Sequence, residues 1–219
     1  MLFNDLEKNL NYKFKDINLL KLALTHKSSN NKINNERLEY LGDSILNTSI
    51  TKYLFFKFPN HGEGLLTRMR SHVVKGETLV NKARELNLIQ YIEISKGTAN
   101  LADNRKFSIL EGSIESIIGA VFLDSDLENV DKFILKLFSI ELSLLEADKE
   151  YRDSKTQLQE LLQSKKLKLP TYLTNISGDG FGCKLELAER VFQATGNSKR
   201  QAEIAAAKEA LIYLKKNNV

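Results

Sequence analysis

The chain has 219 residues, 42% of them hydrophobic, with 32 basic and 28 acidic side chains and a net charge of +4. This length and apolar content allow one large or two modest domains, each with its own core. The single cysteine, Cys183, excludes a disulfide framework and favours a reducing, cytoplasmic location. No apolar run approaches the ~20 residues of a membrane span, and acids interrupt the first 14 residues, so we expect neither a signal peptide nor a membrane partner.

Apolar residues recur at helical spacing through most of the first two thirds of the chain. The pattern is visible in four stretches, 19–24, 36–46, 66–88 and 130–146. Residues 1–147 contain 19 basic and 19 acidic residues, so this part carries no net charge. We therefore predict an all-α first domain over residues 1–147.

The helix predicted over residues 36–46 carries three carboxylates on one stripe. At ~100° per residue, Glu36, Glu39 and Asp43 fall within an arc of roughly 60°. Like charges at this spacing repel by a few tenths of a kcal/mol per pair, so they are tolerated on a solvated face or around a cation. Gly42 argues against a merely solvated face, because a mid-helix glycine costs about 1 kcal/mol relative to Ala and indicates that something approaches the backbone closely.

A second acidic site lies in the apolar stretch 108–124. Glu115 projects onto the apolar face of the predicted helix, and Glu111 lies one turn earlier on the same side. A carboxylate in such a position must be protonated, paired or bound to a cation. Gly112 and Gly119 share the adjacent stripe and would let a second helix pack closely, in particular the one that carries the acidic stripe.

Oxygen ligands that converge from two helices suit a hard octahedral ion such as Mg²⁺, for which Mn²⁺ can substitute. Glu63, in a predicted loop, would add a helper carboxylate. Zinc is not expected, because the chain has one cysteine and three histidines that stand at no ligand spacing, His26, His61 and His72. No small-molecule cofactor is expected.

Four motifs follow one another in this half of the chain: ALTHKS (23–28), NERLEYLGDSIL (35–46), EGLLTRMRS (63–71) and IESIIGAVFLD (114–124). In order and spacing they resemble the ribonuclease III family. The resemblance implies a helical endonuclease domain and a homodimer in which Tyr40 enters a pocket on the partner subunit. It also implies metal ligands at Glu39, Asp43 and Glu115, and two acids that hold the cleavage site against RNA, Glu36 and Glu63.

One position departs from the family pattern. The family usually carries an Asp three residues before the last Glu of the signature, and that position here is Gly112. Glu111, at i, i+4 from Glu115, places its carboxylate on the same helix face. Either Glu111 substitutes as a metal ligand, or it is a peripheral acid and the site has lost one ligand.

The last third of the chain carries the whole charge surplus. Residues 148–219 contain 13 basic and 9 acidic residues. The segment 146–154 is polar, so we place a linker at residues 148–152 and a second domain at 153–219. We predict a helix over 155–166 capped by Thr156 or Ser154, β-stretches at 171–177 and 183–195 with a hairpin near 188–190, and a final helix over 198–216.

This α-β-β-β-α order, opening with KTQLQE and ending with SKRQAEIAAA, resembles the double-stranded-RNA-binding domain. Ser198, Lys199 and Arg200 stand at the N-terminus of the last helix, where cations, backbone N–H groups and the helix dipole attract phosphate. The resemblance implies that Gln157 and Glu160 face the minor groove, where 2′-hydroxyls distinguish RNA.

The roles of two aromatic residues, Phe181 and His26, stay open. The predicted loop 177–183 carries Phe181 where the RNA-binding family usually shows a His. Phe cannot donate a hydrogen bond, so we expect this loop to contact RNA by apolar packing or backbone groups, with reduced affinity. His26 either supports the metal ligands from behind or is a structural histidine.

Together these features predict a homodimeric, Mg²⁺-dependent endoribonuclease that cleaves double-stranded RNA to 5′-phosphate and 3′-hydroxyl ends, with roles in rRNA and mRNA processing. Two alternatives stay open. One is a non-catalytic RNA-binding scaffold, which only Gly112 supports. The other is a regulator that binds double-stranded RNA and rarely cuts it.

Overall fold

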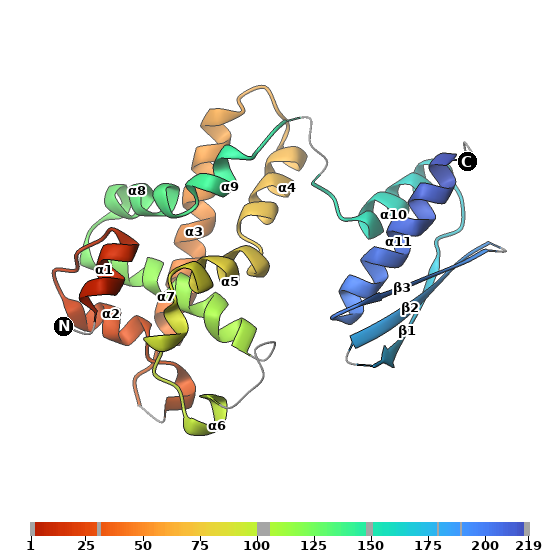
Figure 1. Ribbon diagram of the computed structural model, residues 1–219. Coiled ribbons are helices and arrows are strands. Elements are labelled where there is room, and N and C mark those ends of the chain that lie inside the picture. The colour runs from red at the N-terminus through yellow and green to blue at the C-terminus, as the bar shows by residue number, and fades with distance from the viewer. Residues whose placement is uncertain are drawn as a thin grey trace. The chain divides into compact units, whose positions relative to one another are not determined.

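The computed structural model describes residues 3–29, 32–99, 106–147, 151–178, 180–188 and 190–216. The chain divides into two compact units, Met1–Lys149 and Glu150–Val219 (Figure 1). Of the linker predicted at 148–152, residues 148–150 lie outside the described residues. Across the described ranges, no helix is long and apolar enough to cross a membrane.

The first unit is helical, as predicted. Its described elements are α1 (Asn4–Leu10), α2 (Ile17–Ala23), η1 (Lys27–Ser29), α3 (Glu36–Lys57), α4 (Glu63–Val73), α5 (Gly76–Glu85), η2 (Leu88–Gln90), α6 (Lys96–Ala99), α7 (Phe107–Asp124), α8 (Leu127–Leu137) and α9 (Ser139–Ser143). The helical pattern over 66–88 is split, because Lys75 is extended (φ −64°, ψ 148°) and separates α4 from α5. The pattern over 130–146 also divides, into α8 and α9, at Phe138, which has a φ of −100° and a ψ of 18°.

Helix α7 forms the centre of the first unit and packs along α3. A Cβ on Gly42 of α3 would lie 1.7 Å from the carbonyl oxygen of Glu115, and one on Gly119 of α7 would lie 2.4 Å from that of Leu38. These glycines let the two backbones touch, which confirms the close approach predicted from their positions. The contact places the α3 acids directly beside Glu115.

Buried acids tie the surrounding elements to these two helices. Asp131 of α8 accepts hydrogen bonds from Ser49 and from Lys52 of α3, the latter at 2.7 Å. Asp124, the last residue of α7, accepts from the Tyr12 hydroxyl at 2.8 Å. These bonds hold α8 against α3, and the segment around Tyr12 against the end of α7.

The second unit has the predicted α-β-β-β-α order. It contains α10 (Ser154–Ser164), β1 (Thr171–Ser177), β2 (Gly180–Leu187), β3 (Arg190–Gly196) and α11 (Lys199–Lys216). The strands form one antiparallel sheet in the order β1-β2-β3, and both helices pack on one face of it (Figure 1). The hairpin predicted near 188–190 turns at Ala188, which has a φ of 52°. The core is formed by leucines and by the alanine stripe of α11, including Leu158, Leu162, Leu185, Ala202, Ala206 and Ala210.

The cap of α10 differs from the prediction. The N-cap is Asp153, whose Oδ1 accepts a hydrogen bond from the Thr156 backbone N–H at 2.9 Å. Thr156 and Ser154 lie inside the helix instead. A carboxylate at the N-cap satisfies a free N–H group and also complements the positive end of the helix dipole.

The position of Phe181 corrects a second expectation. Phe181 lies in β2, opposite Ile176 on one side and Gly196 on the other, and packs against the core of the second unit. Only residues 178 and 179 connect β1 to β2, and residue 179 lies outside the described residues. The strands pair up to the turn, so Phe181 belongs to the sheet and not to a loop.

Candidate active site and RNA-binding surface

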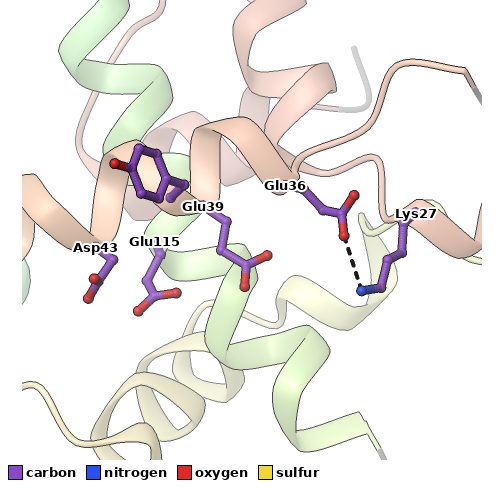
Figure 2. Close-up of a pocket in the computed structure, with 6 residues that line it drawn as sticks. Lys27, Glu36, Glu39, Asp43 and Glu115 are labelled. Carbon is purple, nitrogen blue, oxygen red and sulfur yellow. Dashed lines mark hydrogen bonds and ion pairs between the residues drawn. The ribbon is translucent and has the colours of Figure 1, made fainter.

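The acids of α3 and α7 line a pocket of about 400 Å³. Its lining residues are Lys27, Glu36, Glu39, Tyr40, Asp43 and Glu115. We call Glu36, Glu39, Asp43 and Glu115 the acidic row. Figure 2 shows Asp43, Glu115 and Glu39 next to one another, with Glu36 at the far end, where it meets Lys27.

Glu115 has the most perturbed carboxyl of the row. It is half-buried on α7, and burial raises its pKa to about 8, with further repulsion from Asp43, Glu111 and Glu39. The carboxyl therefore retains its proton at neutral pH unless a cation compensates the charge. This matches the expectation for an acid on an apolar helix face.

Asp43 and Glu39 differ in their surroundings. Asp43 is exposed, and its Oδ1 accepts a hydrogen bond from Asn47 Nδ2 at 2.8 Å. Glu39 is half-buried, and burial raises its pKa, which Lys27 opposes. The sequence analysis missed Asn47, although its i, i+4 spacing from Asp43 was a usable signal.

Lys27 is a further pocket residue that the sequence analysis did not single out. Its Nζ lies 3.1 Å from Glu36 Oε1. This hydrogen bond lowers the pKa of Glu36 and keeps the carboxylate ionised. Asn34 contributes in the same direction, because its Nδ2 donates a hydrogen bond to Glu36 Oε2 at 3.4 Å.

The neighbourhood of Gly112 bears on the missing Asp of the family pattern. A Cβ on Gly112 would lie 2.7 Å from Cδ of Glu39, so the Glu39 carboxylate occupies the space over this glycine. Glu111 does not line the pocket. Its Oε1 lies 2.6 Å from the place of a Cβ on Gly76, at the start of α5. Burial raises the pKa of Glu111, as does the charge of Asp43, so it remains within electrostatic reach of the row.

Three other predicted residues lie at or outside the edge of the pocket. Glu63 begins α4, is exposed, and accepts a hydrogen bond from Thr67 Oγ1 at 3.3 Å without lining the pocket. Tyr40 lines the pocket and is 79% exposed. His26 Nδ1 accepts the Ser28 backbone N–H at 3.2 Å, and burial lowers the pKa of this imidazole.

The donor chemistry of the row fits a hard divalent cation. Among the described residues, no three Asp, Glu, His or Cys side chains lie close enough together to hold a metal ion in their present positions. However, Glu39, Asp43 and Glu115 offer only oxygen donors, from two helices whose backbones touch. Burial first, and then repulsion from Asp43, Glu111 and Glu39, raises the pKa of Glu115, and a bound cation would compensate that negative charge.

The start of α11 presents the predicted phosphate-binding residues of the second unit. Ser198 Oγ accepts the Gln201 backbone N–H at 3.2 Å. Lys199 and Arg200 are exposed, and Arg200 Nη2 lies 3.5 Å from Asp153 Oδ2, at the start of α10. The two helix starts are thus connected through a long, weak ion pair.

Gln157 and Glu160 both contact Arg152, which lies just before α10, and Glu160 is exposed. Gln157 Nε2 donates to the Arg152 carbonyl at 2.9 Å, and Glu160 forms an ion pair with the Arg152 guanidinium. Arg152 precedes the helix and folds back along its first two turns. Exposed ion pairs of this kind are weak, so they leave the predicted role of the two side chains in RNA binding open to test.

The fold and the site define a helical nuclease unit followed by a double-stranded-RNA-binding module. The family described as ribonuclease-III-like matches residues 16–142, and the double-stranded RNA binding motif matches residues 154–214. Ribonuclease 3 of Vibrio parahaemolyticus is 41% identical over 216 residues, covering 95% of this chain and 96% of the relative. Ribonuclease 3 of Marinomonas sp. is 42% identical over 225 residues, covering 100% and 99%.

A solved nuclease domain of ribonuclease III from Campylobacter jejuni is 39% identical to this chain, with a TM-score of 0.62. The match covers 65% of this chain and 99% of the Campylobacter jejuni domain. The chain therefore belongs to the ribonuclease III family. This confirms both the fold class and the family that the motifs predicted.

Proposed function

We propose that this ribonuclease III protein is an Mg²⁺-dependent endoribonuclease that hydrolyses double-stranded RNA at the acidic row. The main support for this proposal is the position of Glu115, a half-buried carboxyl with a pKa of about 8 beside Asp43 and Glu39. An acid so placed is costly without a cation. Perturbed carboxyls that face a pocket are typical of catalytic sites.

Three residues would hold the metal, Glu39, Asp43 and Glu115. A bound divalent ion would strengthen water as a nucleophile and stabilise the charge that develops on the phosphoryl oxygens. Mg²⁺ is the best fit to an all-oxygen site, and Mn²⁺ would substitute. Hydrolysis then leaves 5′-phosphate and 3′-hydroxyl ends, as the family resemblance implies.

The protein's own groups would prepare the site. Asn47 holds Asp43 in one orientation through its amide. Glu115 must give up its proton before it can act as a ligand, and neighbouring negative charge makes that step dependent on the cation. Glu36, kept ionised by Lys27, would help to orient the RNA strand at the end of the row.

We also propose a homodimer through the exposed face of α3. Tyr40 and Phe55 are 79% and 63% exposed, and a spacing of 15 residues puts them about 60° apart around the helix. Large exposed aromatics on one face are typical of an interface. Glu63 lies outside the pocket of its own protomer, so we propose that it acts in cleavage only if dimerisation brings it to the partner's pocket.

The second unit would supply the affinity for duplex RNA. Ser198, Lys199 and Arg200 would bind phosphate at the start of α11, and Gln157 and Glu160 would reach the minor groove. We place the protein in the cytoplasm, in rRNA and mRNA processing, where a free buried cysteine would stay reduced.

Cleavage of a long labelled duplex RNA, with and without Mg²⁺, tests the proposal. The unaltered protein should cut only with the metal. Asp43→Asn should reduce cleavage by at least about a hundredfold, since it removes a charged ligand, and should leave duplex binding largely intact. Glu128→Gln, an exposed acid of α8, is the matched control and should behave as the unaltered protein.

One result would contradict this function, and a second would change its set of metal ligands. Duplex binding without cleavage in Mg²⁺ or Mn²⁺ would favour an RNA-binding scaffold, an outcome that the loss of a ligand at Gly112 would explain. Substantial cleavage by Asp43→Asn in saturating Mg²⁺ would remove Asp43 from the ligands.

A further inference from the structure

A single positively charged side chain, that of Lys27, lies at the end of the acidic row. Among the described residues that line the pocket, Lys27 alone is positively charged, and it also lines an adjoining cavity of about 80 Å³. Its side chain is 61% exposed and contacts Glu36. Figure 2 shows the Lys27–Glu36 pair beyond Glu39, pointing into the pocket region.

The backbone around Lys27 is held by hydrogen bonds, whereas its side chain is exposed and is held only by the ion pair with Glu36. Lys27 opens the short 3₁₀-helix Lys27–Ser29. The His26 backbone N–H donates to the Glu93 carbonyl at 3.0 Å, and the Ser29 N–H donates to the His26 carbonyl at 2.9 Å. The long, exposed Lys27 side chain therefore extends from a hydrogen-bonded backbone segment at the edge of the pocket.

We propose that Lys27 is a phosphate-binding residue of the nuclease pocket. When RNA enters, its ammonium would exchange the Glu36 carboxylate for a non-bridging oxygen of a backbone phosphate next to the cleaved one. The exchange is undemanding, because an exposed ion pair is weak and an ammonium–phosphate hydrogen bond is charge-assisted. This inference rests on the proposed cleavage of double-stranded RNA.

Charge explains why such a residue is needed. The acidic row repels a polyanionic strand, and the first 147 residues carry no net positive charge to offset that repulsion. Lys27 would reduce the repulsion at one end of the row only. A strand held there would lie along the row towards Asp43 and Glu115.

Single-turnover cleavage of a duplex RNA in saturating Mg²⁺, over a series of KCl concentrations, tests the role of Lys27. Lys27→Ala should raise the RNA concentration for half-maximal rate about fivefold and leave the maximal rate within about twofold, as expected when uniform binding is removed. The slope of log affinity against log salt should become shallower by about 0.7–0.9 for each phosphate that the protein no longer neutralises. Lys27→Arg should retain both values.

Two controls separate the cation from its ion pair. Glu36→Gln breaks the same pair but keeps the ammonium, so its salt slope should match that of the unaltered protein, whatever its maximal rate. Lys132→Ala removes another exposed lysine, 2.7 Å from Glu128 on α8, and should change neither value. Thermal melting should show that all variants are folded.

Lys27→Ala with unchanged half-saturation and unchanged salt slope would overturn the role of Lys27 while leaving the proposed function standing. A fall in maximal rate alone would also overturn it, since Lys27 would then act only by positioning Glu36. Absence of cleavage by the unaltered protein is a different outcome, which would contradict the proposed function itself.

Discussion

The protonation of Glu115 is the residue-scale feature with the clearest consequence for pH dependence. Its pKa is about 8 in the folded protein, against an ordinary value of 4.5. Between these values the folded state holds a proton that the unfolded chain has lost. The stability that this proton provides is complete below pH 4.5 and is lost as the pH rises through about 8.

We therefore expect Glu115→Gln to stabilise the metal-free protein at high pH, because glutamine is neutral throughout. In EDTA the melting temperature of the variant should exceed that of the unaltered protein by several degrees at pH 9 and by much less at pH 5. Thermal melts followed by circular dichroism would measure this, with Glu128→Gln as control. An equal difference at both pH values would contradict the argument. Mg²⁺ should stabilise only the protein that retains Glu115.

The exchange of Asp for Gly at position 112 gives a second residue-scale prediction. The Glu111 carboxylate lies against Gly76, so we expect Glu111→Ala to change the Mg²⁺ concentration needed for cleavage by less than about threefold. Gly112→Asp should lower that concentration, because its carboxylate would enter the space beside the Glu39 side chain, which is flexible enough to move.

Calorimetric Mg²⁺ titration would check both variants independently of activity. A rise of about a hundredfold or more for Glu111→Ala would contradict this expectation, since changes to residues behind the ligands typically cost about 10–100-fold. If Gly112→Asp reversed such a rise, Glu111 would be established as the substitute ligand. If Glu111→Ala left Mg²⁺ binding unchanged, the site would work with fewer carboxylates and more water.

At the scale of elements, the α3–α7 contact is the part of the fold least tolerant of change. A methyl group on Gly42 would overlap the Glu115 carbonyl oxygen, and backbone cannot move aside as a side chain can. We expect Gly42→Ala to lower the free energy of unfolding by about 3 kcal/mol, the upper end of the usual cost of overpacking. Urea denaturation would measure it.

Gly64→Ala is the matched control for this substitution. Gly64 lies in the first turn of α4, where a Cβ would meet only Arg68 Nη1 at 3.5 Å. That variant should be unchanged or more stable by up to about 1 kcal/mol, through helix propensity. Equal effects of the two substitutions would mean that the helices do not approach as closely as described.

At the scale of the whole molecule, charge separates capture of RNA from its cleavage. Residues 1–147 have no net charge, and residues 148–219 carry the surplus of +4. A fragment of residues 1–147 should therefore cleave duplex RNA at low salt and lose activity steeply towards physiological salt, where the full chain remains active. Gel assays over a KCl series would compare them. Equal activity at physiological salt would show that the second unit is dispensable for capture.

The sequence by itself determined the family, the order of the two modules and the membership of the acidic row. These depend on periodicity and on motifs within short, contiguous stretches, where helical geometry relates one residue directly to the next. The glycines at 42 and 119 even indicated which helices would touch, because their cost is explained only by a close neighbour.

Only the tertiary structure decided which side chains meet outside the regular spacing of a single helix. It paired Lys27 with Glu36, turned Glu111 towards Gly76 and drew Glu160 to Arg152. None of these contacts follows from spacing, since each depends on a rotamer chosen among packed or charged neighbours. The position of Phe181 was decided in the same way, because strand register is set by pairing across the sheet and not by the residue's own preference.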